Sequence, residues 1–512
     1  MDRTPSPRSL WLVMIPLGLP IFMINIDVTV VNLALPQIAA EMHTSLDDIQ
    51  WVVNGYLIAS AAMVVFGGRL ADMLGRRRVF IAAVVVFVAS SAAAGLAQRP
   101  YQLIISRIVQ GAGMAAYPIS LALLYFSFPG ERRNLAIGIV MSIAWSSAAM
   151  GPTLGGIVLH VLDWRWVFLI NIPPGVVAVI TAMMWIRESE PEADCRMDYF
   201  GQALLSIGLF AVLFALNEGQ TWGYGSARFV SVLVGGLAAL GMLVGVERTV
   251  KAPLLDPKFF RNRCFLSANL VRALFQYVCF GMMFLVSLYV QNILYHTPLA
   301  AGLMMLWFTA TSGVVSPLAG KWIDRAGARF PVTAGLLLIA VSCGLFSTAS
   351  SATTLWSLAP PLALFGLGAS AVISGCASTV LSAVPQSKAG VASGVLYMNA
   401  ALGGAVGIAV TGLIIHLRAT AFMAGRLAAQ AIALSPAQHD WINKTVTGAH
   451  SVQRLLTELP SQIAGPVISD VRDAFVSGFA LNMQFYLALS IIAMAIAWTA
   501  MPAGKHREDE RE

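Results

Sequence analysis

The sequence predicts an all-α protein that crosses a membrane many times. Hydrophobic residues make up 58% of its 512 residues and charged residues 11%, against about 25% charged residues in soluble domains. The mean hydropathy is +0.75. Long apolar runs alternate with short polar segments along the whole chain. This apolar composition is typical of a polytopic membrane protein, and it excludes an ordinary soluble domain.

The lengths of the apolar runs define the predicted transmembrane helices. A helix needs about 20 apolar residues to cross the hydrocarbon core. The first run is too long for a signal peptide and lacks a small-residue cleavage site, so we expect it to be retained. We expect fourteen spans, and an even number places both termini on one side. The runs lie at residues 11–35, 50–70, 79–97, 102–126, 135–159, 166–186, 200–217, 229–247, 265–291, 301–319, 331–349, 355–382, 390–415 and 477–501.

A basic turn sets the orientation. Residues 67–78 read GGRLADMLGRRR between two apolar runs, and arginines this dense must lie in water. The positive-inside rule places this turn, and with it both termini, on the cytoplasmic side. Most of the 32 lysines and arginines then fall on the inner side. The pattern returns as GKWIDRAGAR over residues 320–329, which indicates two related halves.

One sizeable segment lies outside the predicted spans, at about residues 416–476 on the outer side. Its 452–479 part spaces apolar and polar residues loosely at helical intervals. Short amphipathic helices on the outer surface and a mobile linker both fit this pattern.

Several function classes find no support. The net charge of +7 follows from loop arginines, so we expect no nucleic-acid partner. The five cysteines fall in predicted spans or cytoplasmic loops, which indicates no disulfide framework. No metal-ligand cluster, phosphate-binding loop or nucleophile motif stands out. We expect no enzyme activity, no metal and no cofactor.

Four motifs in order resemble the major facilitator superfamily. They are the two basic turns, the segment LIISRIVQGAG (103–113) and the segment GPTLGG (151–156). With fourteen spans, the segment IDVTVVNLALP (26–36) and the long loop before the last span, the chain looks like the EmrB/QacA-type drug:proton antiporter branch. The resemblance implies two six-span bundles, 1–190 and 264–512, with an inserted pair of spans and a linker over 191–263. The long loop 416–476 would be periplasmic.

Asp27 is a candidate proton carrier. At about 1.5 Å per residue it lies roughly 24 Å from the inner end of its span and about 12 Å from the outer end. A carboxylate at this depth is costly unless it is paired, hydrated or protonated. We therefore expect Asp27 to accept a proton and its charge to attract a cation. The residue alone also fits a structural acid capped by Thr29 and Asn32. The resemblance, which places the acid in the span 1 motif, favours function.

Arg107 is the expected partner of Asp27. It lies about five residues, roughly 8 Å, from the outer end of span 4, and thus at nearly the same depth. The resemblance makes spans 1 and 4 neighbours, so the guanidinium could hold or release the carboxylate as the proton comes and goes. An arginine that satisfies span 1 carbonyls, or whose charge reaches outward to water, is the alternative.

The basic turns are candidate conformational latches. Their glycines allow tight turns, and their acids can accept hydrogen bonds from exposed helix N-termini or from arginines. An orientation signal alone would need only the arginines. The latch residues are Gly68, Asp72, Gly75, Arg76, Arg77, Gly320, Asp324, Arg325 and Gly327.

Span 5 carries a third candidate feature. Gly151, Gly155 and Gly156 permit close helix approach, and Pro152 removes a backbone donor and bends the helix. Packing alone would explain any one of them. The resemblance marks this motif as one of exporters that exchange substrate for a proton.

Polar and aromatic side chains in several spans form a candidate substrate path, although ordinary packing also explains them. Arg272 lies about 10 Å from the inner surface, and we expect its side chain to extend to the interface. Glu218, at an outer boundary, is expected to be interfacial. The path candidates are Asn25, Asn32, Gln276, Tyr277, Tyr289, Gln291, Tyr397 and Asn399.

The sequence therefore predicts a proton-coupled antiporter that exports amphipathic or lipophilic, mainly cationic, toxic small molecules across a bacterial cytoplasmic membrane by alternating access. Its partners would be the substrate, protons and the lipid bilayer. The sequence neither requires nor excludes a periplasmic adaptor with an outer-membrane channel. Two alternatives stay open: a transporter of one metabolite, peptide or siderophore, and a non-transporting membrane sensor or scaffold.

Overall fold

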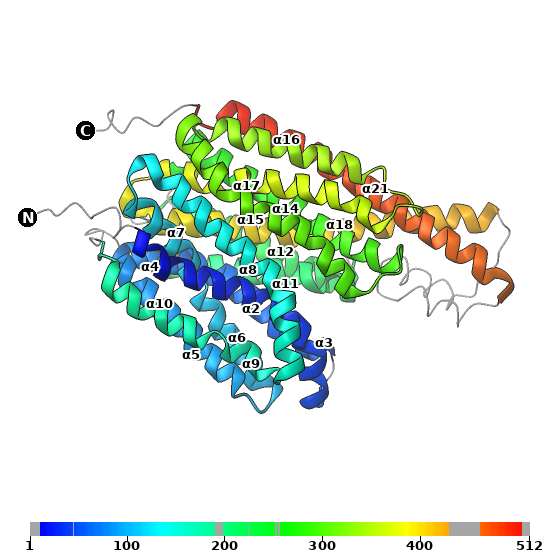
Figure 1. The fold of residues 1–512 in the computed structure, drawn as a ribbon, viewed down its shortest axis with the longest axis horizontal. Coiled ribbons are helices and arrows are strands. Elements are labelled where there is room, and N and C mark those ends of the chain that lie inside the picture. Colours follow the sequence, from blue (N-terminus) through cyan, green and yellow to red (C-terminus); the bar gives the residue numbers. More distant parts are fainter. Residues whose placement is uncertain are drawn as a thin grey trace, which may run out of the picture.

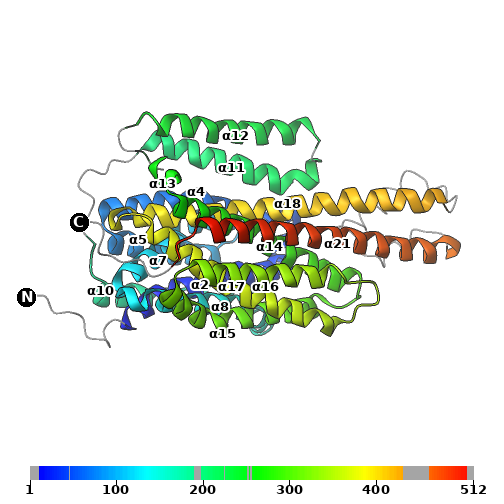
Figure 2. The ribbon, with the colours of Figure 1, turned by 90° about the horizontal axis from the view of Figure 1, so that it is seen from above.

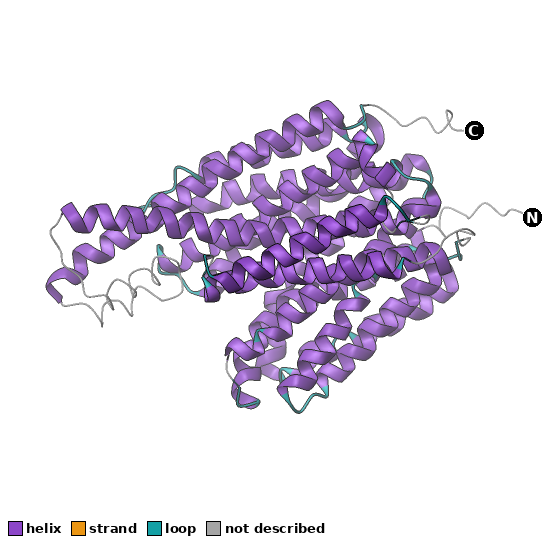
Figure 3. Cartoon of the chain, turned by 180° about the vertical axis from the view of Figure 1, so that it is seen from behind, coloured by secondary structure: helices purple, strands orange, loops and turns teal. Residues whose placement is uncertain are grey.

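The computed structural model describes residues 11–44, 46–189, 198–223, 225–250, 253, 257–429 and 461–503. Within these ranges the regular structure is helical, and Figure 3 shows helices joined by short loops. Fourteen helices are long and apolar enough to cross a membrane. They coincide with the fourteen runs predicted from the sequence, so that prediction is confirmed.

The first group of helices covers residues up to Trp185 and is called here the N-terminal set. Its members are α2 (Met14–Glu41), α3 (Leu46–Ile49), α4 (Trp51–Leu74), α5 (Arg76–Gly95), α6 (Pro100–Gly113), α7 (Ala116–Ser127), η1 (Gly130–Arg132), α8 (Arg133–Val161), α9 (Arg165–Leu169) and α10 (Ile172–Trp185).

Two helices follow that pack on each other, and then a third group that is called here the C-terminal set. The pair is α11 (Tyr199–Trp222) and α12 (Ala227–Glu247), and the short α13 (Pro257–Arg261) leads onward. The C-terminal set is α14 (Arg263–Asn292), α15 (Pro298–Ala326), α16 (Arg329–Phe346), η2 (Leu355–Leu358), α17 (Ala359–Ser382), η3 (Gln386–Lys388), α18 (Ala389–Ala429) and α21 (Ser461–Ala500).

Polar side chains cap the first turns of several helices. The Asn262 side chain accepts hydrogen bonds from the backbone N–H of Cys264 and Phe265 at the start of α14. Thr297 accepts from Ala300 at the start of α15, where proline occupies the first turn. Ser226 does the same for α12. These caps satisfy donors that the first helical turn leaves free, so they fix where the helices begin.

Two long seams join the N-terminal set to the C-terminal set. Helix α8 packs along α15, and α4 packs along α18. Helices α11 and α12 lie to one side in Figure 2, and α11 also contacts α4. In Figure 1 the two sets lie side by side at one end of the molecule and diverge toward the end that holds α3 and α9.

Both ends of the described chain lie near the basic turns, at the end of the molecule where the two sets are side by side. This end is called here the closed end. The Trp11 ring lies 5.4 Å from the Phe128 ring at the end of α7. Arg329, which begins α16 directly after the second basic turn, donates from its backbone N–H to Pro502 and from Nε to Met501. The first span thus begins on the same side of the molecule as that on which the last span ends (Figure 1).

The predicted outer loop 416–476 is helical at both of its ends. Helix α18 continues to Ala429 and α21 begins at Ser461, and Figure 2 shows both helices projecting beyond the rest of the molecule. Arg418 Nε donates to Ser477 Oγ at 3.1 Å, and Arg426 lies 3.8 Å from Asp470. For 461–479 neither of the two readings, separate short helices or a mobile linker, is right, because α21 runs as one helix from Ser461 to Ala500. Residues 430–460 lie outside the described ranges.

Candidate functional site

Asp27 and Arg107 form an ion pair inside the N-terminal set. Asp27 lies on α2 and Arg107 on α6, and Arg107 Nη1 is 2.6 Å from Asp27 Oδ2. The side chains are 0% and 1% exposed, respectively. The depth argument from the sequence therefore placed the two groups correctly relative to each other.

Three further side chains complete the hydrogen bonds of the pair. Gln110 Oε1 accepts from Arg107 Nη1 at 2.7 Å, while Gln110 Nε2 donates to Asp27 Oδ1 at 3.3 Å. Asn171 Nδ2 donates to the same Asp27 oxygen at 3.2 Å. Ser91 Oγ accepts from both amides and donates to the Phe168 carbonyl. Both oxygens of Asp27 are thus hydrogen-bonded.

Aromatic rings and a backbone carbonyl enclose the guanidinium. Arg107 Nε donates to the Val52 carbonyl at 2.9 Å. The guanidinium carbon lies 4.1 Å from the Tyr56 ring centroid and 5.7 Å from that of Phe168. Cation–π contacts of this kind strengthen in desolvated sites. The pair is therefore a closed polar centre that joins α2, α4, α5, α6 and the start of α10.

This enclosure changes the role that Asp27 can take. A carboxylate that is unexposed and paired with Arg107 presents no open negative charge to a substrate. Direct exchange of proton for substrate at Asp27 has no geometric basis in this conformation, and the argument that its charge attracts a cation fails for the same reason.

At the closed end, Asp72 joins the two sets. Its oxygens accept hydrogen bonds from the backbone N–H of Gly390 at 3.0 Å and Val391 at 2.9 Å, at the start of α18. Arg76 Nη2 lies 3.1 Å from the same carboxylate and also donates to the Gln386 carbonyl. An acid at a helix N-terminus is stabilised by the helix dipole and by the free amides.

Asp324 repeats this arrangement in the opposite direction. From α15 it accepts hydrogen bonds from the backbone N–H of Asn134 at 3.1 Å and Leu135 at 3.0 Å, and from Asn134 Nδ2 at 2.8 Å. These amides belong to the first turn of α8. Each set thus supplies one carboxylate to the N-terminus of a helix in the other set.

The remaining latch residues lie beside these contacts. A Cβ at Gly68 would lie 2.2 Å from the Gly390 oxygen, and one at Gly320 would lie 2.1 Å from the Asn134 oxygen. Gly75 and Gly327 have φ values of 99° and 77°, which other residues rarely adopt.

The two other latch arginines, Arg77 and Arg325, are not among the groups described above that bind Asp72 and Asp324. The Arg77 backbone N–H donates to Glu188 and its side chain donates to the Met183 carbonyl. Arg325 is exposed.

The glycines of span 5 face α2 unequally. A Cβ at Gly151 would lie 1.8 Å from Thr29 Oγ1, and one at Gly155 would lie 2.9 Å from Val30. No atom lies within 4 Å of a Cβ built at Gly156. Pro152 lies within α8. Close contact with α2 therefore involves the first two glycines in this conformation.

Some of the predicted path residues gather where the two sets meet. The ring centroids of Tyr397 on α18 and Tyr117 on α7 are 4.7 Å apart, and the Tyr117 hydroxyl interacts with the side chains of Tyr397 and Asn25. Gln276 accepts a hydrogen bond from Arg272 on α14. This junction cluster is Asn25, Tyr117, Tyr397, Arg272 and Gln276.

Other path candidates lie elsewhere. Tyr289 is fully buried within the C-terminal set, and its hydroxyl donates to the Ser350 carbonyl. Tyr277 packs near Tyr486 of α21. Asn32 is exposed and donates to its own helix.

The two remaining path candidates, Gln291 and Asn399, form hydrogen bonds with other side chains of the C-terminal set. Gln291 bonds to Ser287, and Asn399 donates to Asn269 at 2.9 Å. The structure therefore does not bring the eight candidates to one place.

Sequence reasoning missed several residues of these sites. Gln110, Asn171, Ser91 and Tyr117 look like ordinary residues of apolar runs, and spacing along the chain does not tell which helices face each other. The expectation that Arg272 reaches the interface is wrong. The residue is 8% exposed and bonds to Gln276, one turn deeper in the span.

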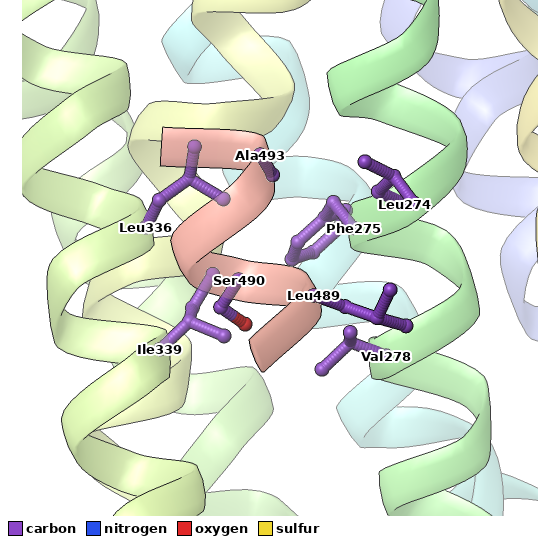
Figure 4. A pocket seen from close by; sticks show the side chains of 8 residues that line it. All are labelled: Leu274, Phe275, Val278, Leu336, Ile339, Leu489, Ser490 and Ala493. Atoms are coloured by element: carbon purple, nitrogen blue, oxygen red, sulfur yellow. The ribbon is translucent and has the colours of Figure 1, made fainter. Parts of the chain in front are cut away.

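A pocket among α14, α16 and α21 carries no comparable chemistry (Figure 4). Its lining is apolar except for Ser490, whose hydroxyl donates to the Tyr486 carbonyl. We interpret it as a seam in helix packing.

Relatives and solved structures agree with this architecture. The chain is 30% identical over 494 residues to the "Tetracenomycin C resistance and export protein" of Streptomyces glaucescens, covering 95% of this chain and 91% of that protein. It is 34% identical over 413 residues to the "Multidrug resistance protein Stp" of Mycobacterium tuberculosis, covering 80% and 76%. The fold resembles that of the proton:xylose symporter XylE with a TM-score of 0.59 at 14% identity, covering 98% and 97%.

The family model described as Major Facilitator Superfamily matches residues 17–408. That range holds the Asp27 centre, both latch acids and the glycines of span 5. The fourteen spans fit the fourteen-span branch of drug:proton antiporters. This chain belongs to the major facilitator superfamily.

Proposed function

We propose that the protein is a proton-coupled antiporter that exports amphipathic or lipophilic small molecules from the cytoplasm by alternating access. The observation that carries the proposal is the Asp27–Arg107 pair, a buried carboxylate and guanidinium within membrane-length helices. Ionisable groups at such depth are costly and commonly serve transport. Relatives named as antibiotic-resistance and multidrug-resistance proteins support export of such compounds.

In this proposal Asp27 carries the proton within the N-terminal set. The deprotonated carboxylate holds Arg107 at 2.6 Å. Protonation removes that charge, and the guanidinium then depends on Gln110, the Val52 carbonyl and the Tyr56 ring. Because α4 and α6 meet at this centre, a shift of Arg107 changes how α4 packs. Helix α4 also forms the seam with α18, so the proton acts on the junction of the two sets.

The two carboxylates at the closed end act as the latch. Residues 1–190 and 264–512 are the bundles that rock, and 191–263 form an inserted pair. With the basic turns in the cytoplasm, the contacts of Asp72 and Asp324 close this conformation toward the cytoplasm, and both termini are cytoplasmic. Asp72 and Asp324 each bind a helix N-terminus of the other bundle, so separation of the bundles must break both contacts. We place the protein in a bacterial cytoplasmic membrane.

A vesicle experiment tests the direction and the coupling together. A fluorescent amphipathic dye is added outside everted and right-side-out membrane vesicles from an expressing strain, a pH gradient is imposed, and dye uptake is recorded. The proposal predicts uptake into everted vesicles that a protonophore abolishes. Accumulation in right-side-out vesicles would identify an importer, and transport that survives the protonophore would remove the proton from the cycle.

A further inference from the structure

Arg272 places a buried positive charge at the junction of the two sets. It lies on α14 and is 8% exposed. Its Nη1 donates to Gln276 Oε1, and its guanidinium carbon lies 5.6 Å from the Phe275 ring centroid. Both contacts are to residues of the same helix. The charge is therefore held within the span, and its position is set by α14.

No carboxylate pairs with Arg272 in the described part of the chain. Helix α14 itself contains no acid, nor do α17 and α18, which pack against it. Asp324 of α15 is bound to the start of α8, and the acids of α21 lie in its outer extension, where Asp470 pairs with Arg426. A charge in a low-dielectric setting is costly without a counter-ion.

The neighbouring side chains provide donors and aromatic surface. Arg272 interacts electrostatically with the hydroxyls of Tyr117 and Tyr397, whose rings are 4.7 Å apart in an edge-to-face contact. Asn25, Gln276 and Tyr397 are only partly buried. The junction cluster thus combines a cation, hydroxyl donors and aromatic faces from both sets. Asp27 adds no competing negative charge, because its carboxylate is paired with Arg107.

We propose that Arg272 is the anion-recognition group of the substrate site, and that the transported compounds are lipophilic organic acids that carry a carboxylate or an acidic phenol. This inference rests on the proposed export function and replaces the cationic substrate class expected from the sequence. The acid group bonds to the guanidinium, which favours the planar geometry of a carboxylate, and the apolar body lies against the tyrosine rings. Aromatic surface suits such bodies.

A binding experiment with three matched probes tests the proposal. The probes are pyrenebutyrate, its neutral amide and a pyrenebutyl trimethylammonium salt, and binding is followed by energy transfer from tryptophan to pyrene at pH 7. The purified protein is held in phosphatidylcholine nanodiscs, so that no anionic lipid competes. The variants are Arg272→Gln, Arg272→Lys and the control Arg263→Gln, which removes an exposed charge from the start of the same helix.

The wild type and Arg263→Gln are expected to bind the acid about tenfold more tightly than the amide, because charged hydrogen bonds are about twice as strong as neutral ones. Arg272→Gln should lose this preference and keep its affinity for the amide, which also reports that it is folded. Arg272→Lys should keep part of the preference. Equal binding of acid and amide by the wild type, tightest binding of the cation, no binding of the acid, or an unchanged preference in Arg272→Gln would each overturn the proposal.

Transport of the same probes separates this inference from the export function. In everted vesicles, uptake of the amide or the cation driven by the pH gradient, without preference for the acid, would overturn the acid class and leave the exporter intact. Acid-selective binding that depends on Arg272, without any transport driven by the gradient, would overturn the antiporter and leave the anion site intact.

Discussion

Arg107 Nη1 lies 2.6 Å from Asp27 Oδ2, although 80 residues separate the two in sequence. Neither side chain has appreciable contact with solvent. A buried ion pair of this kind contributes little net stability, but removal of one partner leaves an uncompensated charge. The two residues must therefore be considered as a unit.

Substitution of Arg107 alone should destabilise the fold more than substitution of both partners. Arg107→Gln leaves Asp27 as an unpaired buried acid, at a cost of roughly 3–5 kcal/mol if it stays charged. The double variant Asp27→Asn with Arg107→Gln removes both charges and should recover most of that loss. Thermal unfolding of the purified proteins in detergent, arranged as a double-mutant cycle, measures the coupling. Additive losses would show that the two side chains do not depend on each other.

Asp72→Asn should weaken the closed end. The Asp72 carboxylate accepts hydrogen bonds from the backbone N–H groups of Gly390 and Val391. Asparagine keeps one acceptor oxygen but lacks the negative charge, and hydrogen bonds to charged groups contribute about 1.5–3 kcal/mol. Loss of part of this energy should shift the population toward a state open at the basic turns.

Spin labels at Leu74 and Lys321, introduced as cysteines after replacement of the five native ones, report the opening by electron–electron distance measurement. A longer distance should gain population in Asp72→Asn. The control is Asp163→Asn, which changes an acid whose side chain is 48% exposed. An unchanged distance distribution in Asp72→Asn would contradict the latch.

The glycines of span 5 should respond unequally to a methyl group. Gly151→Ala places a Cβ 1.8 Å from Thr29 Oγ1, so α8 and α2 must move apart and this conformation should lose stability and transport activity. Gly156→Ala meets no atom within 4 Å and serves as the matched control. Efflux rates and thermal unfolding of both variants check the difference. Equal effects would mean that helix approach at Gly151 is not what matters in this motif.

Much of this architecture could be predicted from the sequence. Span length identified all fourteen helices, and depth along a helix matched Asp27 to Arg107. Helix rotation could not be predicted, because a nearly all-apolar span shows no face from its own pattern. Gln110, Asn171 and Ser91 therefore stayed unrecognised. Arg272 was misplaced for the same reason, since depth alone did not tell that its side chain turns inward toward Gln276.

The ends of the last two spans were harder to place. Arg418 and Arg426 looked like the start of an outer loop, because charged residues normally end a hydrophobic span. The structure pairs them with Ser477 and Asp470 of the opposite helix. Partners on a second helix allow both helices to continue, and a single segment of sequence does not show such partners.

The most direct test measures proton-driven export by Asp27→Asn. The wild type, Asp27→Asn and the exposed control Asp163→Asn are reconstituted in everted orientation in liposomes, and dye uptake is recorded with and without an imposed pH gradient. Because asparagine carries no titrating proton, we predict that gradient-driven uptake is lost in Asp27→Asn and retained in Asp163→Asn. Uptake in Asp27→Asn that still rises with the pH gradient as it does in the wild type would contradict the account.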